Sequence, residues 1–217
     1  MAIAIQLQDA FDIETYDGLV AYIIAHLELD SESAAQVPTF IRKGEYRLNR
    51  LVTAPERETS DTVTTTAGEQ AIALPVDYRQ LRTVQYVADN GYPLEPVTLN
   101  VLHSQYTDAS GAPQVYAVAE QSLQIGPTPD GEYTLNLTYM ARIPPLSEAT
   151  QTNWLLASNA DAYVYSTLWQ AAAWLEDIDA AVAFRNELFS IIEELNLSGN
   201  RYRNSAPMRL RSPGVIV

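Results

Sequence analysis

The stretch ARIPPLSEATQTNWLLASNADAYVY, residues 141–165, marks the place where a strand-rich region gives way to helices. It leaves a predicted strand through Pro144 and Pro145, each of which fixes its own φ and steers the preceding residue away from the helical region. The apolar run Trp154, Leu155 and Leu156 follows. So much apolar surface in a connection predicts packing between two parts of the protein, and simple core packing is the alternative for Trp154.

Two helices are predicted before the strand-rich region. Thr15 is the expected N-cap of the first, which ends before Asp30. The second begins near Ala34 or Pro38 and stops before Pro55, with an apolar stripe on one side and basic residues on the other. The stripe consists of Phe40, Ile41, Gly44, Tyr46, Leu48 and Leu51, and the basic residues are Arg42, Lys43, Arg47 and Arg50.

Residues 59–143 change to a period of two and are rich in β-branched residues, which predicts strands. Residues 98–106 are expected to form a short helix within this region. Residues 114–127 and 131–143 are the last predicted strands, joined by the turn sequence TPDG.

Two further helices follow the double proline. The first is capped by Asn159 or Asp161 and runs to the acidic break at residues 176–179. The second ends at Gly199, a predicted C-cap, and the residues after it are expected to be extended. Its stripe consists of Val182, Arg185, Leu188, Phe189, Ile192 and Leu195.

The predicted fold class is therefore α+β: a four-helix bundle with a β-rich domain inserted between the second and third helices, and an extended C-terminal arm. The expected boundaries are residues 1–56 and 147–199 for the two helical pairs, 57–146 for the insertion and 200–217 for the arm.

The net charge of the chain limits the kinds of partner that it is expected to bind. The formal net charge is −14, and such an acidic surface repels phosphate backbones, so a nucleic-acid reader is not expected. Apolar runs are shorter than a bilayer span requires, and the first residues do not resemble a secretion signal. The chain has no cysteine, which excludes disulfides and thiolate chemistry and fits a reducing cytosol.

All 27 acidic residues lie at or before Glu194, and a basic segment follows it. This polarity suggests an acidic body with a cationic arm. The alternation of Met208 and Leu210 with Arg209 and Arg211 suits an extended segment added to another protein's sheet edge, although an unstructured terminus and a phosphate binder are alternatives. The candidate binding residues are Arg201, Tyr202, Arg203, Met208, Arg209, Leu210 and Arg211.

No catalytic site, metal site or cofactor is predicted. His26 and His103 have no metal-ligand spacing, the carboxylate groups lie on helix surfaces or at a helix break, and neither nucleotide-binding glycine loops nor a GxSxG motif occurs. Tyrosines at and near the predicted strands could form a sugar-binding platform, but packing at half-buried strand positions is the preferred interpretation. They are Tyr106, Tyr116, Tyr133 and Tyr139.

The order of five segments resembles the head-to-tail adaptor (connector) proteins of tailed bacteriophages, especially short-tailed ones. The likeness runs from about Thr15 to Leu197. Its second helix resembles the pattern IPDFIxLAEARINR, with Thr39 in place of Asp and Lys43-Gly44 near the usual Leu-Ala pair. The segments are VPTFIRKGEYRLNRLV, LPVDYRQLRTV, PLEPVTLNVL, YMARIPPL, and TNWLL with NADAYVYSTLWQAA.

The resemblance implies a ring, expected to be dodecameric, at the head-tail junction of the virion. The ring would dock under the portal protein through the C-terminal segment and carry a tail nozzle or tail-tube protein below, after assembly in the host cytoplasm. DNA would pass through the lumen as non-specific cargo, which an acidic wall would not retain. Trp154, Leu155 and Leu156 would then pack partly against the neighbouring subunit.

A virion-associated binding module with a carbohydrate or receptor site on the β domain is the alternative function. An enzyme such as a wall hydrolase is the least favoured.

Overall fold

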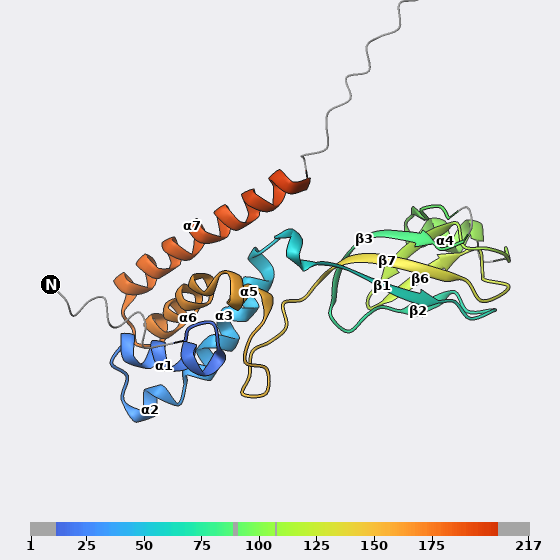
Figure 1. Cartoon of the computed structure of the whole chain (residues 1–217). Coiled ribbons are helices and arrows are strands. Elements are labelled where there is room, and N and C mark those ends of the chain that lie inside the picture. Colours follow the sequence, from blue (N-terminus) through green and yellow to red (C-terminus); the bar gives the residue numbers. More distant parts are fainter. Residues whose placement is uncertain (1–11, 89–90, 107, 204–217) are drawn as a thin grey trace, which may run out of the picture. The chain divides into compact units, whose positions relative to one another are not determined.

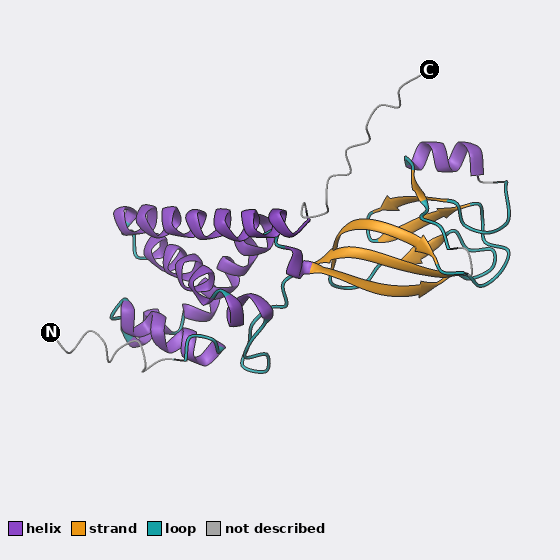
Figure 2. Cartoon of the chain, turned by 45° about the horizontal axis from the view of Figure 1, so that its top comes forward, coloured by secondary structure: helices purple, strands orange, loops and turns teal. Residues whose placement is uncertain are grey.

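The computed structural model describes residues 12–88, 91–106 and 108–203, with side chains described as far as residue 197. The chain divides into two compact units. One comprises residues 1–55 and 145–217, and the other comprises residues 56–144. Helices make up the first unit, whereas the strands and helix α4 make up the second (Figures 1 and 2). The α+β class is confirmed.

The helical unit contains α1 (Tyr16–His26), α2 (Ser31–Ala34), α3 (Val37–Leu51), α5 (Trp154–Ser158), α6 (Ala160–Trp174) and α7 (Ile178–Arg203). Thr15 caps α1, as predicted, by accepting a hydrogen bond from the Gly18 backbone N–H through its side chain. Asp30, expected only to end the first helix, caps the short α2 in the same way through Ser33. Helix α6 packs against both α3 and α7 and is buried on most sides.

Gly44 allows α3 and α6 to approach closely. A Cβ atom at position 44 would lie 2.7 Å from Ser166 Oγ and 3.3 Å from Ser166 Cβ. Ser166 is fully buried, and its hydroxyl donates a hydrogen bond to the Tyr163 carbonyl, so it has little freedom to move. A glycine inside a helix costs about 1 kcal/mol relative to alanine, and close packing of the two helices offsets that cost here.

Gly44→Ala is therefore expected to lower the free energy of unfolding by about 1–2 kcal/mol despite the better helix propensity of alanine, because the core becomes overpacked. Chemical denaturation measures the change. In the double variant Gly44→Ala/Ser166→Ala the clashing oxygen is gone, and most of the lost stability should return. A stabilised Gly44→Ala variant would contradict the close approach.

The β unit contains two sheets. The first has the order β1 (Glu58–Thr64), β7 (Thr134–Ala141), β3 (Tyr78–Tyr86), and all its strands are antiparallel. The second has the order β2 (Ala71–Ala73), β6 (Ser122–Gly126), β5 (Val115–Ala119), β4 (Glu95–Pro96), in which only β4 and β5 are parallel. The predicted short helix is α4 (Leu99–Tyr106), which packs against β5 and β6.

One core serves both sheets. Strand β7 has the predicted alternation as far as Tyr139: Leu135, Leu137 and Tyr139 are buried, whereas the residues between and before them are less buried, and the alternation ends at Met140, which is buried too. The other members of this core come from β3, from β5 and β6, and from the segment before β4: Val84, Leu94, Tyr116, Leu123 and Ile125. The unit therefore has a hydrophobic core of its own.

The last helix is longer than its sequence suggests. Helix α7 continues through Gly199 to Arg203, so the prediction that Gly199 ends it is wrong. A glycine weakens a helix without breaking it, and proline, which does break one, first occurs after this point at Pro207. Arg201, Tyr202 and Arg203 lie in the last turn of α7, whereas Met208, Arg209, Leu210 and Arg211 lie outside the described residues.

Candidate interaction surfaces

The chain passes between the two units at Pro55 and again at Pro144 and Pro145. Both residues of the double proline are exposed, and no strand or helix includes them. Residues 146–153 then form an irregular segment, called here the return segment, that leads into α5. Backbone hydrogen bonds fasten it, because the Tyr16 N–H donates to the Gln151 carbonyl at 2.6 Å.

The apolar run of Trp154, Leu155 and Leu156 begins a short helix, α5, that was not predicted from the sequence. Asn153 caps α5: its side-chain oxygen accepts hydrogen bonds from the backbone N–H groups of Leu155 and Leu156 at 3.1 and 2.9 Å. Leu155 and Leu156 are fully buried, and α5 packs against α6, whereas Trp154 is only half-buried. The sequence does contain a signal for the start of this helix, because asparagine is a preferred N-cap residue and Asn153 directly precedes the apolar run.

A buried polar cluster fixes the return segment to three helices. Glu45 of α3 accepts a hydrogen bond from the Leu146 backbone N–H at 2.7 Å, and the Tyr163 hydroxyl of α6 lies 3.5 Å from the same carboxylate oxygen. Asn153, which caps α5, donates to the Tyr163 oxygen at 2.7 Å. All three side chains are buried, so the loss of one would leave the others unsatisfied.

Glu45 lies on the packed side of α3, where the predicted apolar stripe had placed Tyr46. Glu45 is 6% exposed, whereas Tyr46 is 60% exposed, so the assignment of Tyr46 to the packed side is wrong. The buried positions Ile41 and Leu48 lie four residues before and three residues after Glu45, which is core spacing. That spacing could have predicted the burial of the Glu45 side chain. The charge of a glutamate, taken by itself, predicts exposure.

Burial raises the pKa of Glu45, because desolvation outweighs the hydrogen bonds from Leu146 and Tyr163 and the nearby charge of Arg42. Burial likewise raises the pKa of Tyr163. A carboxylic acid whose pKa is higher in the folded state favours folding most below its unfolded pKa. This contribution is lost as the pH rises through the folded value.

We expect Glu45→Gln to keep the acceptor for Leu146 and to remove the charge. The free energy of unfolding of the wild type, relative to that of Glu45→Gln, should decline as the pH rises above the ordinary value of 4.5. Denaturation curves at several pH values measure this. Glu69→Gln on the exposed surface is the matched control, and parallel curves for wild type and Glu45→Gln would contradict the burial of charge.

The two ends of the β unit are held side by side. Glu58 at the start of β1 pairs with Met140 near the end of β7. Arg57, only 2% exposed, donates from Nε and Nη2 to the Ala141 carbonyl at 2.9 and 2.7 Å. Burial lowers the pKa of Arg57 to about 10, so the guanidinium stays charged at neutral pH. The β unit therefore begins and ends at one place, as an inserted domain requires.

The four tyrosines do not form one exposed platform. Tyr116 and Tyr139 are buried in the β core, and the Tyr139 hydroxyl donates to Asp77 at 2.9 Å. Burial and this hydrogen bond raise the pKa of Tyr139 to about 12. Tyr133 packs edge-on against Tyr86 and donates to Asp130, while Tyr106 is half-buried. The tyrosine side chains that would form a sugar-binding platform instead pack against other residues of the β unit.

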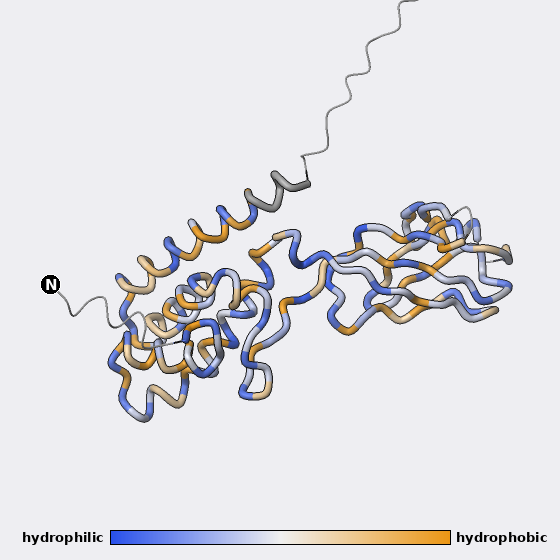
Figure 3. Tube along the Cα trace, in the orientation of Figure 1, coloured by the Kyte–Doolittle hydropathy of each residue, from blue (hydrophilic) through white to orange (hydrophobic). Residues whose placement is uncertain are grey.

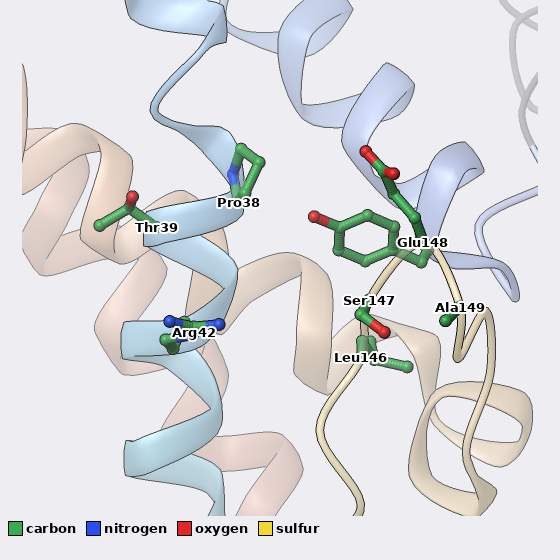
Figure 4. Close-up of a pocket in the computed structure, with 8 residues that line it drawn as sticks. Pro38, Thr39, Arg42, Leu146, Ser147, Glu148 and Ala149 are labelled. Carbon is green, nitrogen blue, oxygen red and sulfur yellow. The ribbon is translucent and has the colours of Figure 1, made fainter.

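An open depression of about 560 Å³ lies in the helical unit between α3 and the return segment. Figure 4 shows Pro38, Thr39 and Arg42 on α3 and residues 146–149 across from them. Its walls carry the cation of Arg42, the carboxylate of Glu148 and hydroxyl groups, among them that of the buried Tyr16. This arrangement provides no evident catalytic pair.

Metal ligands do not cluster in the described part of the chain: no group of three histidine or acidic side chains there could hold an ion. His26 lies on α1, where it stacks on Tyr22 and contacts Phe184. His103 lies on α4 and is exposed.

Across the described ranges, none of the helices is both long and apolar enough to cross a bilayer.

The described residues thus form two compact units, and the chain passes between them at Pro55 and at the double proline. Residues 14–211 match the family model described as SU10 adaptor protein, which represents phage head-to-tail adaptors. The chain belongs to the SU10 adaptor protein family. No curated protein matches it.

The resemblance to phage adaptors is thus confirmed, and the match covers nearly the whole chain. Membership makes the protein a structural component of the virion neck, and it implies contacts with portal and tail components in general.

Proposed function

We propose that this protein forms a dodecameric ring that docks beneath the portal and joins it to the tail nozzle or tail tube. The match to a phage adaptor family over residues 14–211 carries the proposal. The two units support it, since each has its own core and can offer a separate surface to a separate partner. The ring assembles in the host cytoplasm, and DNA passes through its lumen.

In this proposal α1, α3, α6 and α7 form a four-helix body, the β domain of residues 56–144 is inserted between α3 and the return segment, and the arm of residues 200–217 begins within the last turn of α7. The order and packing of α3, α6 and α7 support such a body. The acidic composition suits a wall past which DNA slides, because repulsion keeps the duplex from binding.

The arm is the proposed portal anchor. It follows the last acidic residue, Glu194, and contains four arginines that can pair with carboxylates or lie along a partner's backbone. The end of α7 is well placed to support it. Asn196 donates to the Leu51 carbonyl at 3.0 Å and accepts from the Thr53 N–H at 2.7 Å, so α7 is fastened to the end of α3 just before the arm begins.

A chain ending at Gly199 should stay folded and lose portal binding. The Asn196 hydrogen bonds remain in it, so its melting temperature should match that of the full chain, whereas its affinity for purified portal particles should fall by about tenfold or more. Sedimentation with portal particles measures the affinity.

The full-length chain provides the matched controls. Replacing Arg201, Arg203, Arg209 and Arg211 by lysine keeps the charge and should retain most of the binding, whereas replacing them by glutamine should not. Equal portal affinity for the truncated and full-length chains would show that the arm is not the anchor.

We also propose that the double proline directs the chain out of the β domain and that, of the apolar run, Trp154 packs partly against a neighbouring subunit, because Leu155 and Leu156 are already fully buried in the helical unit. Trp154 is the one of the three that remains partly exposed, and is thus available to another surface.

Trp154→Ala should therefore weaken ring assembly on portal particles while changing the stability of the monomer little. Leu155→Ala is the contrast, because a fully buried leucine contributes about 2–5 kcal/mol to folding. Counting subunits per portal by native mass spectrometry, alongside denaturation of the free chain, separates the two effects. Unchanged assembly of Trp154→Ala would remove this residue from the interface.

A further inference from the structure

The face of α3 that points away from the core is basic. Arg42, Lys43 and Arg50 are exposed there, with Tyr46 among them. The helix has one acidic residue, Glu45, and it is buried on the opposite side. We call Thr39, Arg42, Lys43, Tyr46 and Arg50 the basic face.

The outer face of α7 is acidic and partly apolar. Leu188 and Ile192 are buried toward the core, whereas Val182 and Phe189, which the sequence placed on the same packed stripe, are 42% and 44% exposed. That prediction is wrong for these two residues. Figure 3 shows hydrophobic and hydrophilic positions alternating along this helix. We call the exposed residues Glu187, Glu193 and Glu194 the acidic face, and Val182 and Phe189 lie at its apolar edge, where Phe189 contacts Trp169.

The charged side chains of the two faces form no ion pairs within the described part of the monomer, although Arg50 donates from Nε to the Tyr46 carbonyl at 3.0 Å and the charge of Arg42 acts on Glu45. Among the described side chains, no carboxylate forms an ion pair with Arg42, Lys43 or Arg50, and no basic group forms one with the three glutamates of the acidic face. Both helices direct their buried sides toward α6, through Gly44 on α3 and Leu188 on α7, and so expose the charged sides.

The spacing of the charges matches. Lys43 and Arg50 are seven residues apart on the basic face, and Glu187 and Glu194 are seven residues apart on the acidic face. At a rise of about 1.5 Å per residue, each pair spans about 10 Å. Two salt bridges can therefore form together when the helices lie alongside each other. Tyr46, the exposed aromatic residue of the basic face, lies between Lys43 and Arg50.

We propose that the basic face of α3 in one copy of this protein docks on the acidic face of α7 in the next copy. This proposal rests on the ring function proposed above and names the surfaces that close the ring. An α3–α3 contact would oppose cations and an α7–α7 contact would oppose anions, so the complementary arrangement is head-to-tail. Head-to-tail contacts generate rings when the rotation closes.

The contact is weak and sensitive to salt, because exposed ion pairs contribute little individually and are screened. Free chains do not close a ring at ordinary concentrations, whereas chains held side by side on a portal do. Copy-to-copy docking therefore follows portal binding.

Charge reversal tests the pairing. Lys43→Glu/Arg50→Glu makes both faces acidic, and Glu187→Lys/Glu194→Lys makes both basic, so neither variant alone should form rings on portal particles. We expect subunit occupancy to fall about tenfold for each, a difference of about 1.4 kcal/mol per contact. An equimolar mixture should restore occupancy, because every contact between unlike variants is complementary. The chain that carries all four substitutions should also assemble.

Arg79→Glu/Arg142→Glu, which reverses two exposed cations of the β unit, is the matched control and should assemble as the wild type does. Circular dichroism verifies that every variant is folded. Normal assembly of either reversed variant, or failure of the mixture to restore it, would overturn the proposed contact and leave the adaptor function standing. If wild-type chains do not load onto portals at all, the adaptor function and the contact both fall.

Discussion

The contact between α3 and α6 is the interaction on which the structure depends. Helix α3 precedes the inserted β unit and α6 follows it, so this contact closes the helical unit across residues 56–144. Gly44 allows the two backbones to approach, and Glu45 in the next position binds the return segment through the Leu146 N–H. Two adjacent residues of α3 thus set both the distance to α6 and the path by which the chain re-enters the unit.

The β unit is suited to insertion between α3 and the return segment, because its two ends lie together. Its first and last strands are paired, and the Arg57 guanidinium binds the Ala141 carbonyl beside them, so the insertion starts and finishes at one point. A domain with adjacent ends can be inserted in a connection without separating the elements on either side of it. For an adaptor this separation is useful, because one unit can change its surface for one partner while the core of the other is undisturbed.

Periodicity predicted most of the fold, since the long helices and the alternation in β7 follow directly from burial on one side. It could not reveal what depends on tertiary contacts. Glu45 is charged but buried because Leu146 and Tyr163 satisfy it, and Tyr46 is aromatic but exposed. Residues 114–127 read as one strand, yet the chain turns at Glu120, which adopts φ of 53° without a glycine to signal it. For the same reason, the exposure of Phe189 could not be predicted from its helical spacing.

We infer that this protein works by geometry, joining the capsid portal to the tail through separate surfaces of one small chain. Cryo-electron microscopy of the neck in purified virions tests it most directly. We expect a closed ring of this chain between the portal and the tail. The helical unit should fit the density of each subunit, and the C-terminal segment should contact the portal. Purified virions that lack the protein, or that carry it away from the neck, would contradict a role in joining portal and tail.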